Sequence, residues 1–390
     1  MSVVNFPNKK PNKKKIAFCI LIFAIILFSI IFKIIYTYNL SFRRFVDLNV
    51  LRKEIKNDTL STIELNSEED NFYCSYDKYI AIINKKILYI YNSSGEKLEE
   101  YDINIASPIF SYNNKFLLIG EENGSNIYLI SGTNVVYQKT IEGNISNVNV
   151  NKNGYASIIT SGNSYKSIIL SFDLKGNELF KTYISTNLAI ISCISHDNKY
   201  LSIGEIDYSG SIIKSTIKTI SIENAKNNPS NSIISVYSLE NNLLLTNLKY
   251  NTKNTVIFST NSTINLLDVI NNSNSVISTF ENKYDFIDIN LSNNFIYTYN
   301  ESFGLSNTLI ANIYNYSSQS VNTYKFNGSI KSIYTNENKI ALNTGSEIHF
   351  INTNGWLIKK YISYNEIKNI LLGDNIAGIV YKNKIEIIEI

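Results

Sequence analysis

The pattern of apolar and polar positions changes near residue 72. From there to the C-terminus, short stretches rich in Ile, Val, Tyr, Phe and Thr alternate with turns rich in Asn, Ser and Gly. This alternation predicts β-strands joined by tight turns. One unit recurs, in which a polar turn separates two apolar strands. Its second strand begins at Lys78, Lys115, Gly154, Lys199, Asn254, Asn294, Lys339 and Asn375.

Successive copies of this unit are about 42 residues apart on average, a period typical of repeat proteins. The longest step contains a polar insertion at 224–231. A third strand follows in each unit, as at Ile87–Tyr91, and then a turn and a fourth strand, as at Glu96–Ile103. Four antiparallel strands in this length are typical of a β-propeller blade. The pattern therefore predicts an all-β propeller.

The two ends of the repeat region predict how the ring closes. The last unit has strands near 367–372, 376–381 and 385–390 and no fourth strand after them. An isolated strand signal, Leu60–Leu65, precedes the first unit. If it supplies the missing strand, no edge is left open at the seam. We therefore expect a propeller over 59–390 with eight four-stranded blades, whereas seven blades would require two units to merge.

The clearest units resemble known propellers. Ser195–Gly204 and Ser111–Gly120 are similar to the S-x-D-x-K-x-L-A turn of TolB-type and WD40-like propellers, although no unit ends in the Trp-Asp pair of WD40 blades. The resemblance covers residues 60–390 and implies a propeller fold. It brings no catalytic residue with it.

An apolar run near the N-terminus predicts a membrane anchor. Residues 16–36 are apolar apart from Ser29 and Lys33. As a helix they would span about 31 Å, the thickness of a bilayer core. A cleaved signal peptide is disfavoured because the run is long and no small-x-small site follows. We expect a basic tail over 1–15, a transmembrane helix over 16–36 that contacts the lipid bilayer, and a juxtamembrane helical stalk over 37–58.

Lysines next to this run favour a cytoplasmic N-terminus. The other flank also carries basic residues, so charge counting alone is nearly balanced, but the N-terminal cluster is tighter and has no acidic neighbours. With this topology, the arrangement of basic tail, membrane helix and propeller resembles Gram-positive single-pass proteins with an extracytoplasmic propeller of unknown function. The residues that carry this topology prediction are Lys9, Lys10, Lys13, Lys14, Lys15 and Lys33.

Composition excludes several classes of protein. The chain has 36 basic and 33 acidic residues, and the N-terminal lysines account for the net charge of +3. The propeller region has no basic excess, so we expect no nucleic-acid partner. Three cysteines cannot form a disulfide scaffold, and Cys74 and Cys193 are expected to be buried free thiols on different blades. A single Trp disfavours the quinone-dependent dehydrogenases, which stack several around their ring.

No sequence motif indicates catalysis, and we predict no catalytic, metal-binding or cofactor-binding residue. His196 is interpreted as a turn residue beside Asp197, and His349 as a strand residue. The favoured function is a non-catalytic scaffold that binds an envelope protein or polymer. The alternative is a carboxylate-dependent hydrolase or lyase acting on envelope glycans, since two carboxylates suffice for that chemistry. A sensor ranks third because its tail is short. Oligomeric state is not readable from these patterns.

Overall fold

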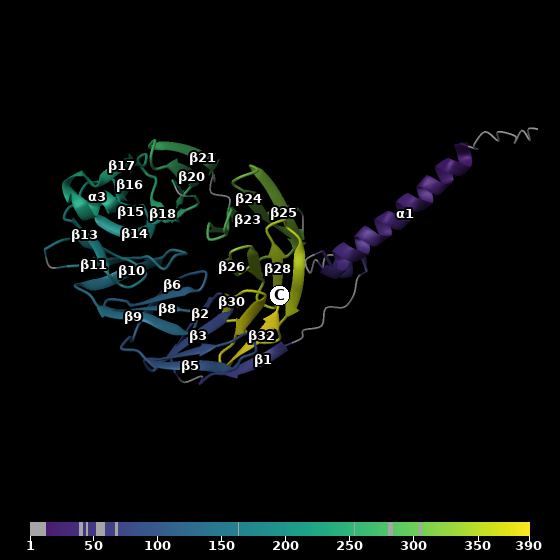
Figure 1. Ribbon diagram of the computed structural model, residues 1–390, viewed down its shortest axis with the longest axis horizontal. Coiled ribbons are helices and arrows are strands. Elements are labelled where there is room, and N and C mark those ends of the chain that lie inside the picture. The colour runs from purple at the N-terminus through teal and green to yellow at the C-terminus, as the bar shows by residue number, and fades with distance from the viewer. Residues whose placement is uncertain are drawn as a thin grey trace, which may run out of the picture.

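A computed structural model describes residues 13–38, 42–43, 46–51, 59–66, 69–162, 164–252, 254–279, 284–303 and 306–390. In these residues eight four-stranded antiparallel sheets surround a central axis (Figure 1). The fold is therefore an eight-bladed β-propeller, and the predicted fold class and the favoured blade count are confirmed.

Each blade follows the same strand order from the axis outward, and each second strand lies at or within a residue or two of its predicted start. Blades one to four are β2 (Asn71–Tyr76), β3 (Tyr79–Asn84), β4 (Ile87–Tyr91), β5 (Lys97–Asp102); β6 (Pro108–Asn113), β7 (Phe116–Glu121), β8 (Asn126–Ser131), β9 (Asn134–Thr140); β10 (Asn144–Val150), β11 (Ala156–Ser161), β12 (Ser167–Phe172), β13 (Glu178–Ile184); β14 (Leu188–Ile194), β15 (Tyr200–Asp207), β16 (Lys214–Ser221) and β17 (Ile233–Ser238).

The second half of the ring repeats this order, and its last blade is composite. Blades five to eight are β18 (Leu245–Tyr250), β19 (Thr255–Thr260), β20 (Thr263–Asp268), β21 (Ser273–Thr279); β22 (Phe286–Asp288), β23 (Asn294–Phe303), β24 (Ser306–Asn315), β25 (Ser320–Asn327); β26 (Ser332–Asn336), β27 (Lys339–Asn343), β28 (Glu347–Asn352), β29 (Leu357–Ile362); β30 (Asn369–Leu372), β31 (Ile376–Val380), β32 (Lys384–Glu389) and β1 (Thr59–Glu64).

The N-terminal strand closes the ring as predicted. β1 pairs antiparallel with β32, with Ile63 opposite Ile385. Ile63 is buried with Ile387 in the core between blades eight and one. The outer strand of the last blade thus comes from the start of the propeller, which holds the two ends of the domain together.

The polar turns fold locally through side-chain hydrogen bonds. In blade four the Ser195 hydroxyl accepts hydrogen bonds from the backbone N–H groups of Lys199 and Tyr200 and donates one to Asp197. Asn198 in the same turn has a φ of 60°, a left-handed conformation that Asn adopts at low cost. These bonds explain why Ser, Asp and Asn suit the first turn of blade four.

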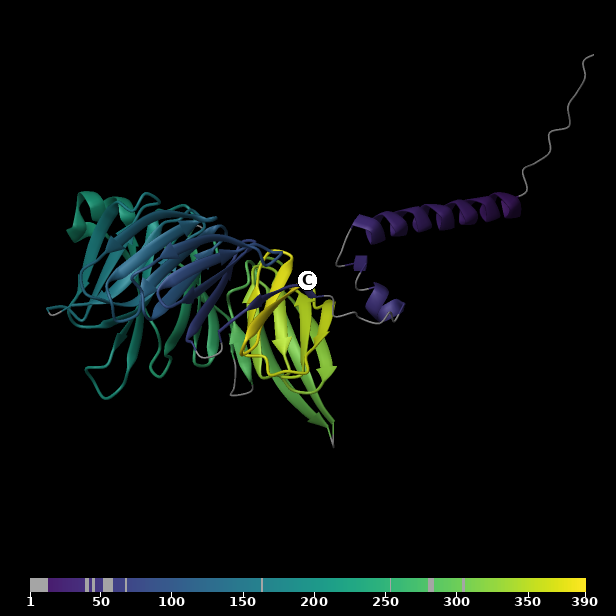
Figure 2. The same cartoon turned by 90° about the horizontal axis from the view of Figure 1, so that it is seen from below.

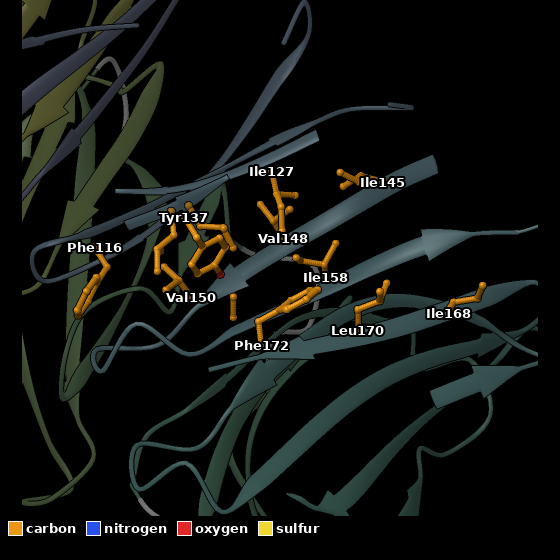
Figure 3. Close-up of a cluster of buried hydrophobic side chains, with 13 residues drawn as sticks. Phe116, Ile127, Tyr137, Ile145, Val148, Val150, Ile158, Ile168, Leu170 and Phe172 are labelled. Atoms are coloured by element: carbon orange, nitrogen blue, oxygen red, sulfur yellow. The ribbon is translucent and has the colours of Figure 1, made fainter. Parts of the chain in front are cut away.

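The hydrophobic core lies between neighbouring blades. Figure 3 shows one such cluster, in which side chains of β7–β9 in blade two pack against those of β10–β12 in blade three. Every residue of β12 is buried. Side chains on one face of this third strand, such as Leu170, pack against blade two, and Ile169 on the other face packs against blade four. Repetition of these contacts around the ring makes a rigid frame.

The antiparallel strand order gives the ring two distinct faces. The turns after first and third strands lie on one face, and β1 also begins there, because Ile390 at the end of β32 donates its N–H to Asn375 in a first turn. We call it the anchor face. The turns after second strands lie on the distal face. Figure 2 shows the helix α3 (Ile222–Asn227) on one side and the far end of the β23–β24 strand pair on the other.

The anchor helix is separate from the ring. α1 (Lys13–Tyr38) extends away from the propeller (Figure 1). In the described part of the chain it is the one helix long and apolar enough to cross a membrane, over Ile20–Tyr38, and none of that window is buried. Of the predicted stalk, a short π-helix at Val46–Val50 is described, and Tyr36 donates a hydrogen bond to Asp47. Lys9, Lys10 and residues 52–58 lie outside the described residues.

Candidate functional site

A cavity of about 670 Å³ occupies the anchor-face end of the central channel. All eight blades contribute to its wall, because each first strand ends beside the axis and passes into its first turn. A smaller cavity of about 280 Å³ continues from it and shares Tyr112, Asn290 and Thr335. The combined space is in the range of small-ligand sites in proteins.

On blades five to eight several polar side chains of the cavity walls are hydrogen-bonded within the protein. Lys249 donates a 2.6 Å hydrogen bond to the carbonyl oxygen of Leu291. The Asp288 carboxylate accepts the backbone N–H of Asn290 at 2.6 Å. Lys339 donates to the carbonyl oxygen of Gly373 at 2.9 Å and lies 3.6 Å from Asp374. We call this part of the wall the paired arc.

Burial changes the titration of two charged groups in the paired arc. It lowers the pKa of Lys249 to about 8, and the nearby Asp288 carboxylate only partly opposes this effect. Burial also raises the pKa of Asp288, against the lowering effects of its hydrogen bonds and of Lys249. Each group is thus only partly stabilised by the other, as expected for charges taken out of water.

On blades two to four the wall is different. Its lining includes the polar side chains of Tyr112, Asn113, Asn149, Lys152 and His196. Within the described part of the chain, none of these five side chains makes a hydrogen bond or ion pair. We call this set the open arc. It presents donors and acceptors to the channel with no protein partner.

The open arc is electropositive around His196. Burial lowers the pKa of His196, and the positive charges of Lys152 and Lys249 lower it further, while Asp197 acts in the opposite direction. His196 is therefore held neutral near pH 7. A negatively charged group placed here would meet two lysines, and blades two to five contribute no carboxylate to the lining of the larger cavity.

The distal face carries a second feature, an exposed group of large apolar side chains on blades three and four. The Tyr165 and Tyr183 rings lie 4.7 Å apart, and the Lys166 ammonium lies 4.1 Å from the Tyr208 ring centre. The first contact lies within blade three, and the second connects the second turns of blades three and four. We call the group the aromatic patch, and its apolar members, each 39–51% exposed, are Tyr165, Tyr183, Leu188, Tyr208, Ile212 and Ile213.

Sequence comparison places the propeller in a family. The sequence model of a family of unknown function, DUF5711, matches residues 51–390. The chain belongs to the DUF5711 family. No curated protein matches it in sequence. The family match includes the whole ring and therefore both the cavity and the aromatic patch.

Solved propellers resemble this DUF5711 chain in fold. The C-terminal WD40 domain of Sif2 superposes with a TM-score of 0.59 at 11% identity, covering 85% of this chain and 98% of that one. Sqt1 of Chaetomium thermophilum, solved bound to the N-terminus of ribosomal protein L10, gives 0.54 at 10% identity, covering 86% and 100%. The dihydro-heme d1 dehydrogenase NirN gives 0.51 at 8%, covering 84% and 72%. One of the three is an enzyme, so the fold alone does not decide catalysis.

The cysteines and histidines discussed in the sequence analysis lie at different positions in the propeller. Cys74 and Cys193 are buried free thiols whose pKa is raised by burial, and they line the smaller and the larger cavity respectively. His349 is buried in β28, where its ring bonds Tyr324. His196 is a turn residue, as interpreted, but it also lines the channel.

The sequence-based interpretation missed the open arc and the paired arc. Their members lie at the ends of first strands, in first turns or, for Lys339, at the start of a second strand. These positions converge on the axis only when the ring is closed. A signal was present, because each unit places polar residues at this junction. In the described residues no group of three or more His, Cys, Asp or Glu side chains is placed to hold a metal ion.

Proposed function

We propose that this protein is a membrane-anchored scaffold whose propeller lies outside the cytoplasm and binds a protein or polymer of the cell envelope. The aromatic patch carries the proposal. Contiguous exposed aromatic and aliphatic side chains are uncommon on the surface of a soluble domain and mark interaction sites. Tyr residues are also favoured at protein interfaces.

The position of the patch supports a role in partner binding. It lies on the distal face, whereas the chain from the anchor helix enters the ring at the anchor face. Loops of two blades build it, so its shape is set by the rigid frame beneath. Sqt1, a structural neighbour, was solved bound to a peptide segment of another protein, which shows that this fold supports protein binding.

The anchor helix supports the proposed location. The helix at Ile20–Tyr38 would cross the bilayer once. The lysines Lys13, Lys14 and Lys15 at the start of α1, with Lys9 and Lys10 before them, favour a cytoplasmic N-terminus under the positive-inside rule. The propeller would then face the envelope.

A site-specific crosslinking experiment tests the binding role. A photo-reactive residue at Tyr208 should capture a defined partner in living cells, identified by mass spectrometry. The same residue at Val321, which is 49% exposed on an outer strand of blade six, is the matched control. Equal recovery from both positions, or recovery from neither, would contradict the proposal.

Asp288 favours a second candidate function, hydrolysis or elimination of an envelope glycan. Burial raises the pKa of this carboxyl, as is common for a general acid. It lines the smaller cavity, which continues into the larger one. If this function holds, incubation of the protein with wall and capsule glycans would cleave glycosidic bonds and release glycan fragments with new chain ends. Asp288→Asn should then abolish release while leaving glycan binding intact, and no release from any glycan would exclude it.

A further inference from the structure

The donors of the open arc are suited to a ligand rich in oxygen. The amides of Asn113 and Asn149 each both donate and accept, which matches the hydroxyl groups of a sugar. Tyr112 is 41% exposed although it lies inside the channel, so its ring is available to pack against an apolar sugar face. The adjacent cavity of about 670 Å³ is large enough for a disaccharide.

The charges of the cavity are divided between its two sides. Lys152 and Lys249 line blades three and five, and blades two to five contribute no carboxylate to the lining of the larger cavity. The acidic lining residues Asp77, Glu337 and Asp374 lie on blades one, seven and eight. This division favours a ligand whose negative group points to blades three to five.

We propose that the open arc, together with Lys249, binds an acidic saccharide, with the ligand carboxylate between Lys152 and Lys249 and its hydroxyl groups on Asn113 and Asn149. Tyr112 supports the sugar ring. The inference rests on the proposed function in one respect, because only a propeller outside the cytoplasm would be exposed to such a glycan. The site itself follows from the unpartnered side chains and the division of charge.

Binding should be coupled to protonation of His196. The groups that face this ring are Lys152 from blade three, Lys249 from blade five and Asp197 in its own turn. A carboxylate near the two lysines offsets their charge and raises the pKa of His196. Complex formation below pH 7 should therefore take up a proton, which His196→Asn removes without removing the lysines.

Calorimetry on the full chain in nanodiscs tests the site. The probes are disaccharides ending in glucuronic, galacturonic or mannuronic acid, each compared with its neutral counterpart. We expect at least one acidic disaccharide to bind about tenfold or more tightly than its neutral partner, the effect of a charge-assisted contact. Lys152→Met and Asn149→Leu should each weaken that binding by a similar factor. Lys175→Met, on an exposed turn of the same face, should leave it unchanged.

The proton uptake provides a second readout that a purely structural role of these residues would not produce. Binding enthalpies at pH 6 should vary with the ionisation enthalpy of the buffer, and His196→Asn should remove that variation. Absence of binding by every acidic disaccharide, equal binding of the neutral partners, or insensitivity to Lys152→Met would overturn the inference. Capture of a partner at Tyr208 would in that case still support the scaffold, so the two proposals fail separately.

Discussion

The Lys249 ammonium in blade five donates a 2.6 Å hydrogen bond to the Leu291 carbonyl oxygen in blade six. This contact crosses the boundary between two blades at the channel wall. The positive charge of Lys249 also contributes to lowering the pKa of both His196 and Asp288. One side chain therefore joins the frame of the ring to the candidate site.

Lys249 should make the stability of the ring depend on pH above neutrality. Its pKa is about 8 in the folded protein and 10.5 for an unperturbed lysine. Between these values the unfolded chain binds more protons, so folding stability rises with pH. From pH 7 to pH 10, wild type should gain about 1–3 kcal/mol relative to Lys249→Met. Urea unfolding of residues 52–390 measures this, and parallel pH profiles for the two proteins would contradict it.

His349 should weaken the fold in mild acid. Its Nδ1 atom lies 2.9 Å from the Tyr324 hydroxyl, and Nε2 lies 3.2 Å from Glu347. Burial lowers its pKa, reinforced by Lys360 and opposed by Glu347. The unfolded chain therefore binds the proton more readily, and stability falls as pH drops below 6.5, the ordinary value for histidine.

The substitution His349→Gln isolates this effect. It removes the titrating ring, so the loss of stability between pH 7 and pH 5 should become smaller than in wild type. Glu347 titrates below this window because its pKa is lowered from 4.5. Unfolding midpoints at both pH values provide the measurement, and an unchanged slope would show that the ring does not control acid stability.

Glycine at the end of a second strand lets the next blade approach closely. A Cβ on Gly120 would lie 2.6 Å from Val148 Cγ1, on the first strand of blade three. Gly120→Ala should therefore cost about 1–3 kcal/mol through overpacking. Gly210→Ala is the control, since a Cβ there meets nothing within 3.8 Å. Thermal unfolding of both variants measures the difference. Similar unfolding midpoints would contradict the explanation that a Cβ at Gly120 overpacks the interface between blades.

Closure by β1 should contribute strongly to stability. Ile63 is 5% exposed between blades eight and one, whereas Leu60 on the same strand is 53% exposed. Ile63→Ala should cost about 2–5 kcal/mol, as other core truncations do. Leu60→Ala should change stability by about 0.5 kcal/mol or less. Denaturant unfolding measures the free energy of unfolding of both variants, and equal losses of stability would contradict this expectation.

The side of the membrane on which the propeller lies can be measured with a single added thiol. Tyr364 is 95% exposed on the distal face, and the propeller cysteines are buried. In a Cys19→Ser background, Tyr364→Cys should react with a membrane-impermeant maleimide in intact cells. Labelling only after lysis would place the propeller in the cytoplasm.

Several parts of the structure could be predicted because they depend on local chemistry. The turn at Ser195–Tyr200 is held by its own side chains, and the strand alternation fixes which residues face a neighbouring blade. Closure was predicted on a different ground: the last unit lacks a fourth strand, an open edge leaves backbone groups unpaired, and the signal at Leu60–Leu65 could fill that edge. The apolar run at 16–36 predicted a helix that is long enough to span a bilayer.

The candidate sites could not be predicted in this way. Tyr112, Lys152 and His196 lie on three different blades, and only closure of the ring brings them to one wall. The same is true of Tyr165 and Tyr208, which the packing of blades three and four joins into one patch. The sequence by itself determined strands, turns, repeat and anchor, because neighbours along the chain set them. The tertiary structure alone decided which polar groups face the channel without a partner, because burial and pairing depend on contacts between residues far apart in sequence.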